Sequence, residues 1–312
     1  MSVLVLIDEA GELSAQATSL GRSVADGLGT DLAAVVVGDT PVEAAVDTVW
    51  RIRHEVLSDY APGAWGEAIV QLAAQQMPAA VVAPGTDRGN EVLAHVAALA
   101  DLPMVANVIE IDSRSDVWRL VRVRWGGSLL EEAELEAAVR LVSAAPHAFP
   151  ASPPATTPPA EVVFEPSLGE EHVVTRVVDR VTAEAGITLA TAPVVVSGGR
   201  GVGGPEGFRP LEELAELLDG AVGCSRVVTN NGWRPHSDQV GQTGTRVAPD
   251  VYIACGISGA IQHWVGMMAS KHVIAVNTDA EAPMVTKADY ALIGDVAEVV
   301  PAIVAEIRRR RG

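Results

Sequence analysis

The chain has 312 residues, of which 48% are hydrophobic and only 4% aromatic, and this length suffices for two domains with separate cores. The formal net charge of −18, from 22 basic and 40 acidic side chains, disfavours non-specific binding to nucleic acid or to an anionic membrane. No apolar run reaches transmembrane length, so we expect no direct insertion into a membrane. The two cysteines give no disulfide framework, and no secretory or transit leader is recognisable, so we expect a cytoplasmic protein.

The charge is distributed unevenly along the chain. Residues 1–189 carry 11 basic and 27 acidic side chains, a net −16, whereas residues 190–312 carry 11 and 13, a net −2. An acidic surface that keeps the protein soluble explains the first part. The nearly neutral second part is where an anionic ligand would meet the least repulsion.

The first half alternates β-branched runs, typical of buried strands, with longer helical patterns. Strands are predicted at 3–7, 33–37 and 79–83, with helices around 15–28, 64–75 and 90–100. This order indicates βαβ units and a mainly parallel sheet. The runs 105–111 and 117–125 flank a polar turn and predict an antiparallel hairpin.

The proline-rich run PASPPATTPPA at 150–160 predicts an extended connection. The strand-like EVVFEP at 161–166 follows it and is expected to return to the first sheet. A helix is predicted over 172–185. We therefore place the domain boundary after this helix, giving an N-terminal domain over 1–189 and a C-terminal domain over 190–312.

The second half repeats the strand-helix rhythm. Strands at 194–196, 251–254, 272–276 and 290–293 end in glycines or small polar residues, and helices are predicted at 210–218, from the GISGA segment to 268, and up to 306. The sequence thus predicts two doubly wound α/β domains. In open α/β sheets the carboxyl ends of the strands are where ligands bind.

The segment GGRGVGG contains G-x-G-x-x-G at Gly199, Gly201 and Gly204, directly after a strand. A standard dinucleotide fingerprint needs the helix to begin within the motif and an acidic residue at the end of the next strand. Pro205 interrupts the helix and Asp219 lies at a helix end, so a standard NAD-type site is rejected. Arg200 among the glycines is expected to contact an anion.

The segment GISGA at 256–260 is close to the G-x-S-x-G nucleophile elbow, but Ala260 replaces the last glycine. The later histidines, His263 and His272, are not placed as a catalytic base, which disfavours a hydrolase. The seven histidines form no HxH or HExxH pair, so no metal site is expected. The loop QVGQTG at 239–244 combines glycines with hydrogen-bonding side chains suited to a polar ring.

Together these segments resemble the alpha subunit of electron transfer flavoprotein. The resemblance rests on VVVSGGRGVGG, GAVGCSRVVTNNGW, QVGQTG, YIACGISGAIQH, NTDAEAP and ADYALIGD, which occur in the order and spacing of that family. In the first half it rests more loosely on VLVLID, VVAPGTDRGNEVLAHVAALADLPM and VRVRWGG. The sequence departs from the family at Thr278, where lysine is usual, at Cys224, where alanine is common, and at Asn230, where aspartate is common.

The resemblance implies one FAD per chain, held mainly by the second domain. Carried over by position, its ligands are Arg200, Ser225, Arg226, Val240, Gly241, Gln242, Thr243, Ser258, Gly259, Ala260, Ile261, Gln262, His263, Asn277, Asp295 and Val296. The family arrangement implies Arg226 beside the isoalloxazine ring, Thr243 at its N5 and His263 near its O2. These three residues are the expected electron-transfer centre, since a flavin that accepts an electron needs donors and positive charge there.

The resemblance also implies a heterodimer with a beta subunit that holds AMP or a second FAD. Such a protein carries electrons and has no substrate of its own. It takes electrons from a flavoprotein dehydrogenase, such as an acyl-CoA dehydrogenase of fatty acid beta-oxidation, and passes them to a quinone oxidoreductase. Two alternatives stay open: a subunit of an electron-bifurcating complex, and a non-redox nucleotide-binding module.

Overall fold

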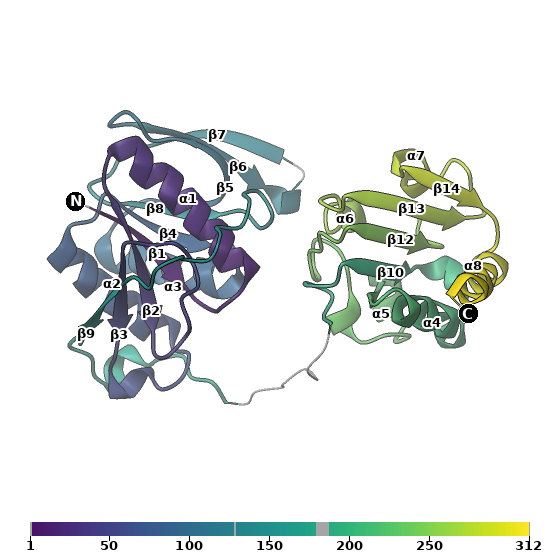
Figure 1. The fold of residues 1–312 in the computed structure, drawn as a ribbon, viewed down its shortest axis with the longest axis horizontal. Helices are drawn as coiled ribbons and strands as arrows, with labels where there is room; N and C mark the ends of the chain where they lie inside the picture. The colour runs from purple at the N-terminus through teal and green to yellow at the C-terminus, as the bar shows by residue number, and fades with distance from the viewer. Residues whose placement is uncertain (1, 128, 179–186, 312) are drawn as a thin grey trace. The chain divides into compact units, whose positions relative to one another are not determined.

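The computed structural model describes residues 2–127, 129–178 and 187–311 (Figure 1). They form two compact α/β units, one within residues 1–182 and the other mainly within 183–312. The predicted fold class, two domains with mainly parallel sheets, is confirmed. The boundary predicted at residue 189 stays a prediction, because it adjoins residues 179–186, which lie outside the described residues.

In the described residues, the first unit contains a nine-stranded sheet in the order β7-β6-β5-β8-β4-β1-β2-β3-β9. Its strands are β1 (Ser2–Ile7), β2 (Asp31–Val37), β3 (Thr48–Ile52), β4 (Ala80–Pro84), β5 (Met104–Asp112), β6 (Trp118–Arg124), β7 (Leu129–Leu135), β8 (Arg140–Ala144) and β9 (Ala160–Phe164). Pairing is parallel from β5 to β9, while β6 and β7 are antiparallel to their neighbours. The predicted hairpin and the predicted return of residues 161–166 to this sheet are therefore confirmed.

Helices cover both faces of this sheet. The buried residues of α1 (Glu12–Leu28) pack with Val3 and Val5 on one face. The helices α2 (Pro62–Gln76) and α3 (Asp87–Ala100) pack with Leu4 and Leu6 on the other. Because side chains alternate along a strand, the continuous apolar run of β1 supplies two cores at once. Short 3₁₀ turns lie at η1 (Glu55–Leu57), η2 (Trp125–Gly127) and η3 (Glu170–His172).

The second unit has a five-stranded sheet in its described residues, in the order β11-β10-β12-β13-β14. Its strands are β10 (Val194–Gly198), β11 (Ala221–Cys224), β12 (Val251–Cys255), β13 (His272–Asn277) and β14 (Tyr290–Ile293), and every pairing between them is parallel. All five carboxyl ends therefore lie along one edge of the sheet.

Two layers cover the second sheet. One face packs against α4 (Arg209–Leu217) and α8 (Val296–Arg311), and α5 (Arg226–Asn230) adds Val228 to the same core. The other face packs against loop residues 240 and 247 and against Met267 and Met284, near the short helices α6 (Ile261–Trp264) and α7 (Pro283–Lys287). Short 3₁₀ turns lie at η4 (Arg200–Val202), η5 (Pro205–Phe208) and η6 (His236–Asp238). The second face is thus covered largely by loops that lead to the strand ends.

Two predicted helices differ from the structure in the described residues. After η3, residues 173–178 are not helical, and the remainder of the helix predicted over 172–185 falls outside the described residues. Val174 is 88% and Val178 97% exposed. These β-branched side chains therefore make no packing contacts that would offset the unfavourable free energy of helix nucleation. The helix predicted up to 268 is present but ends earlier, at Trp264. Two residues further on, Gly266 lies against the backbone of Gly241, where a Cβ would come within 2.3 Å of a Cα atom.

Candidate functional site

The predicted cofactor residues gather at the carboxyl edge of the second sheet. They follow the strands in turn: Arg200 after β10, Ser225 and Arg226 after β11, Ser258, Gly259, Ala260, Ile261, Gln262 and His263 after β12, Asn277 at the end of β13, and Asp295 and Val296 after β14. The strand order reverses at β10, which lies between β11 and β12. At such a switch point the loops of neighbouring strands diverge and leave a crevice where open α/β sheets bind ligands.

Glycines let two of these loops meet directly at the switch point. The N–H of Gly199 donates to the carbonyl of Cys255 at 2.8 Å, and that of Gly201 donates to the carbonyl of Gly256 at 3.0 Å. A Cβ on Gly201 would lie 2.7 Å from Cα of Gly256, which itself has φ +64°. The loops after β10 and β12 therefore present bare backbone, which is the surface that a dinucleotide phosphate approaches closely.

The loop at residues 239–245 joins this edge from outside the strands. The N–H of Val240 donates to the carbonyl of Cys224 at 2.9 Å, and the N–H of Gln242 donates to the carbonyl of Gln262 at 2.7 Å. These bonds connect the loop to the end of β11 and to α6. Val240 and Gly241 are buried, whereas the side chains of Gln242 and Thr243 are exposed.

His263 is a buried residue of α6, the short helix that follows β12. The Tyr252 hydroxyl of β12 is 2.8 Å from its Nε2, and the two rings meet edge to face. Burial lowers the pKa of His263 to about 4, while the Val240 carbonyl acts in the opposite direction. The imidazole is therefore neutral at pH 7 and keeps one donor and one acceptor nitrogen.

Two buried polar atoms in the site have no hydrogen-bond partner among the described residues. They are Oγ of Ser225, which precedes α5, and Nδ1 of His263. Buried polar groups in native proteins are almost always paired, since an unpaired one costs about 1–3 kcal/mol. Both atoms occur among the residues that the sequence assigns to the flavin, and a bound polar ligand would satisfy them.

Positive charge at the site is available for an anion. The guanidinium groups of Arg200 and Arg226 are exposed and form no ion pair with any described residue. Arg234, nearby in sequence, is instead held by Glu212 and Asp238. Unpaired cations next to bare backbone suit a diphosphate and an electron-accepting ring.

The remaining predicted residues shape the loops. Nδ2 of Asn277 donates to the carbonyl of Ile257 at 3.1 Å, and Asp295 Oδ1 accepts the N–H of Ala297 at 2.8 Å at the beginning of α8. Gly259 has φ +83°, and a Cβ there would lie 2.3 Å from the N of Met284. The residues present therefore fit a flavin dinucleotide in three respects: backbone exposed at glycines, buried polar atoms without a partner among the described residues, and arginines that no described residue pairs.

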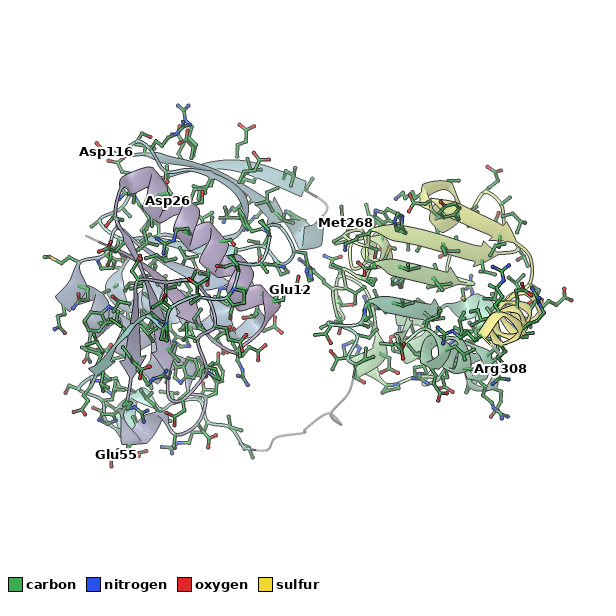
Figure 2. All side chains as sticks on the ribbon, in the orientation of Figure 1. Glu12, Asp26, Glu55, Asp116, Met268 and Arg308 are labelled. Atoms are coloured by element: carbon green, nitrogen blue, oxygen red, sulfur yellow. The ribbon has the colours of Figure 1, made fainter. Side chains whose placement is uncertain are left out.

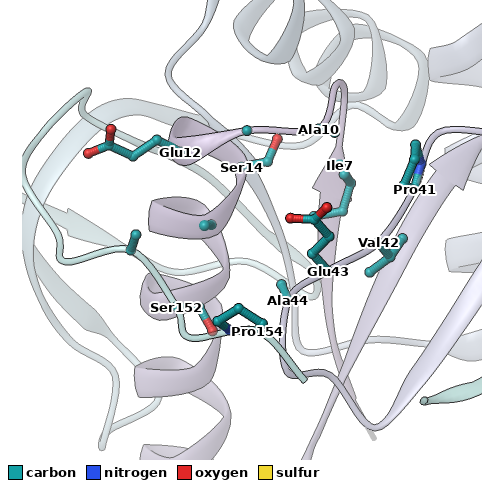
Figure 3. A pocket seen from close by; sticks show the side chains of 13 residues that line it. Ile7, Ala10, Glu12, Ser14, Pro41, Val42, Glu43, Ala44, Ser152 and Pro154 are labelled. Atoms are coloured by element: carbon teal, nitrogen blue, oxygen red, sulfur yellow. The ribbon is translucent and has the colours of Figure 1, made fainter. Parts of the chain in front are cut away.

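The first unit has a cavity of about 280 Å³ at the beginning of α1 (Figure 3). Glu12 and Glu43 line it, and the buried Asp8 already accepts the N–H of Glu9 and the hydroxyl of Ser14. Carboxylates repel phosphate, so this cavity suits a nucleotide poorly. The exposed acidic side chains of this unit include Glu12, Asp26, Glu55 and Asp116 (Figure 2).

The comparisons with known proteins agree with the geometry. Residues 3–168 match the electron transfer flavoprotein domain, and residues 188–268 match the electron transfer flavoprotein FAD-binding domain. The chain is 31% identical to electron transfer flavoprotein subunit alpha of Thermoanaerobacterium thermosaccharolyticum over 92% of its length and 91% of the relative. It is 36% identical to protein FixB of Bradyrhizobium diazoefficiens, covering 93% and 83%, and 33% identical to the alpha subunit of Mycobacterium tuberculosis, covering 99% of each.

The chain belongs to the electron transfer flavoprotein alpha-subunit family. Its FAD-binding domain is the second unit, and the matched region includes β10, β11 and β12 with their loops. The acidic cavity lies in the other unit, so we do not assign it to the flavin. Within the described residues, no group of histidine, cysteine, aspartate or glutamate side chains is placed to hold a metal ion, and no helix combines the length and apolar character needed to cross a membrane.

Two residues at the site, Gln239 and Tyr252, are not predicted from the sequence. Gln239 is buried and bonded to the hydroxyls of Thr243 and Thr229, and Tyr252 supports His263. A signal for Tyr252 was available, because a tyrosine in a central buried strand needs a partner for its hydroxyl. Gln239 opens the QVGQTG segment, but sequence alone does not reveal which of its amides turns inward.

Proposed function

We propose that the chain is the alpha subunit of an electron transfer flavoprotein, which binds one FAD at the carboxyl edge of its second sheet and carries electrons without a substrate of its own. The observation that carries the proposal is the convergence of five strand ends and the 239–245 loop. That edge contains two buried polar atoms, Ser225 Oγ and His263 Nδ1, for which the described part of the chain offers no hydrogen-bond partner, and it also contains Arg200 and Arg226, which pair with no acidic side chain described there.

In this proposal different loops bind different parts of FAD. Arg200 and the backbone of residues 199–201 and 256–260 hold the diphosphate, while Asn277, Asp295 and Val296 lie toward the nucleotide end. Arg226 would lie at the edge of the ring, Thr243 at its N5 and His263 near its O2. Bound FAD supplies the electron-accepting isoalloxazine system.

The protein side chains set the electrostatics around that ring. The Arg226 guanidinium favours negative charge on the ring, because a nearby cation stabilises it most where water is excluded. Neutral His263 offers a hydrogen bond without adding charge, since burial keeps its pKa at about 4. The Thr243 hydroxyl offers a further hydrogen bond. The site thus favours acceptance of an electron by preorganised donors.

Membership of the family supports a proposal about the partners. We propose a heterodimer with a beta subunit that holds AMP or a second FAD. The donor is a flavoprotein dehydrogenase, such as an acyl-CoA dehydrogenase of fatty acid beta-oxidation, and the acceptor is a quinone oxidoreductase. An electron-bifurcating role remains the alternative, and it depends on whether the beta subunit holds a second flavin. We also propose that the complex acts in the cytoplasm.

Co-purification with the cognate beta subunit tests the proposal. We expect a yellow one-to-one complex with one FAD bound by the alpha chain. Counts of flavin and AMP per complex then separate the two roles: one FAD and one AMP support the carrier, and two FAD support bifurcation. A stable complex that binds a nucleotide but no flavin would instead identify a non-redox nucleotide-binding module.

A further inference from the structure

Gln239 is a buried glutamine whose side-chain amide is bonded at both ends. It is only 2% exposed. Its Nε2 donates to Oγ1 of Thr243 at 2.9 Å, and its Oε1 accepts the hydroxyl of Thr229 at 2.7 Å. The amide therefore joins α5, which contains Thr229, to the loop that carries Thr243.

The backbone of Gln239 is fixed as well. Its N–H donates to the carbonyl of His236 at 3.0 Å, and its carbonyl accepts the N–H of Thr245 at 2.7 Å. A Cβ on Gly244 would come within 2.2 Å of that carbonyl oxygen, so the turn closes tightly against it. Neither the backbone nor the side chain of Gln239 is free to move without breaking these contacts.

The direction of the bonds determines what Thr243 can do. A threonine hydroxyl has one hydrogen to donate and two lone pairs. Because Oγ1 of Thr243 accepts from the amide, its own hydrogen is not used in that bond. Thr243 is exposed, so this hydrogen is available to an acceptor outside the protein. On the opposite side the amide oxygen lies 2.7 Å from the Thr229 hydroxyl, whose single hydrogen is shared with the carbonyl of Arg226 at 3.0 Å, and the N–H₂ group faces Thr243.

We propose that Gln239 is a positioning residue, which acts through Thr243 and presents its hydroxyl as a hydrogen-bond donor to N5 of the flavin. The proposal rests on the proposed function, because it requires a flavin in front of Thr243. Gln239 itself does not touch the ring. A purely structural glutamine would join α5 to the loop equally well, so the test must read the hydrogen bond at the flavin and not only the stability of the fold.

A double-mutant cycle on the FAD-loaded heterodimer separates these roles. Gln239→Met keeps the length of the side chain but donates nothing, Thr243→Val removes the hydroxyl, and the third variant carries both changes. Each protein is reconstituted with FAD labelled with ¹⁵N at N5. The measurements are the ¹⁵N5 chemical shift and the equilibrium constant for the first one-electron reduction.

We expect Gln239→Met and Thr243→Val to move the N5 resonance in the same direction, toward a nitrogen without a donor. Each should lower the one-electron equilibrium constant, roughly three- to tenfold. In the Thr243→Val background, the further change to Gln239→Met should have no additional effect on either measurement, since residues acting through one contact are not additive. Additive effects, or an N5 resonance unmoved by Gln239→Met, would overturn the proposal.

Gln16→Met is the matched control. Gln16 is 3% exposed and also bonded at both ends, to Glu12 and to the N–H of His147, but it lies in α1 of the first unit. Replacing Gln16 should lower the free energy of unfolding by a similar amount and leave the ¹⁵N5 chemical shift unchanged. If Gln239→Met does not fold, Thr229→Val is used instead. This change removes the hydrogen bond to the Gln239 amide oxygen and leaves Gln239 in place. An N5 resonance that does not move in Thr229→Val contradicts the proposal. Wild-type heterodimer without flavin would refute the proposed function itself, whereas flavin-loaded protein with an unaffected N5 refutes only the role of Gln239.

Discussion

The Tyr252 hydroxyl lies 2.8 Å from Nε2 of His263, and both side chains are buried. Burial raises the pKa of Tyr252, so its hydroxyl stays protonated, and burial lowers the pKa of His263 to about 4. The pair is therefore neutral at pH 7. The Tyr252 hydroxyl fixes the Nε2 end of the imidazole in the core of the second unit, and the Val240 carbonyl also acts on the ring.

The depressed pKa of His263 predicts a loss of stability in mild acid. The ordinary imidazole pKa is 6.5, so between pH 6.5 and about 4 the unfolded chain takes up a proton that the folded chain excludes. The stabilisation is complete above pH 6.5 and declines as the pH falls, at up to about 1.4 kcal/mol per pH unit. Urea unfolding of the flavin-free chain at several pH values measures it. The same series on His263→Gln should show a shallower decline, and identical slopes would contradict the assignment.

Removing the tyrosine hydroxyl should destabilise the second unit. Tyr252→Phe leaves Nε2 of His263 buried without a partner, which costs about 1–3 kcal/mol in the free energy of unfolding. The control is Tyr290→Phe, because Tyr290 of β14 is 66% exposed, and its change should stay within about 0.5 kcal/mol. Equal losses in the two variants would show that the Tyr252 hydroxyl contributes nothing specific.

Arg226→Ala should lower the first one-electron potential of the bound flavin. A hydrogen bond to a charged group contributes about 1.5–3 kcal/mol, which corresponds to roughly 60–130 mV for a one-electron couple. FAD should remain bound, because the diphosphate contacts lie with Arg200 and its neighbours. Arg226→Lys should recover part of the shift, since an ammonium does not reproduce the planar fork.

Spectroelectrochemistry of flavin-loaded protein measures this potential. Arg308→Ala is the control, because Arg308 is exposed near the far end of α8 and pairs with Glu213 (Figure 2). An unchanged potential in flavin-replete Arg226→Ala would assign Arg226 a structural role only.

The glycine contact at the switch point should be essential for flavin binding. Gly256 has φ +64°, and a Cβ there would lie 2.7 Å from Cα of Gly201. Gly203 also has positive φ, +87°, but a Cβ there meets nothing within 4 Å. Gly203→Ala should therefore cost about 1 kcal/mol of backbone strain and keep its FAD. Gly256→Ala should also displace the loop and lose the flavin. Isothermal titration calorimetry measures the affinity of each variant for FAD. Equal affinities would mean that the loops after β10 and β12 can separate without loss of flavin binding.

Most of the fold was predictable because the buried strands have continuous apolar sequences. The strands β1, β2 and β4 and the helices between them follow from periodicity alone. The strands β3, β7, β8 and β11 were not predicted. β7 has the sequence LLEEAEL, and its glutamates resemble a helical surface until Arg122 and Arg124 of the neighbouring strand pair with Glu131. Periodicity does not show this pairing, because it depends on the chain folding back into a hairpin between Arg122 and Glu131.

The candidate site was predictable as a set of loops, and less so as a set of contacts. Glycines and small polar residues at strand ends indicate where a backbone must approach a ligand. The supports behind them, Gln239 and Tyr252, depend on which side chains of neighbouring elements meet in the core. The described part of the helix predicted over 172–185 is not α-helical, since a local pattern does not show that Val174 and Val178 lack a core to pack against.

The position of β8 in the first sheet has a consequence for synthesis. A chain leaves the ribosome from its N-terminus, yet β4 pairs with β8 (Arg140–Ala144), and β3 acquires its outer neighbour only with β9 (Ala160–Phe164). Until residue 144 has emerged, the growing sheet exposes the β4 edge, and until residue 164 it exposes the β3 edge. Open edges recruit other strands. A polypeptide truncated before residue 164 is therefore an aggregation-prone fragment and not a smaller domain, so the N-terminal unit matures only when translation has passed more than half of the chain.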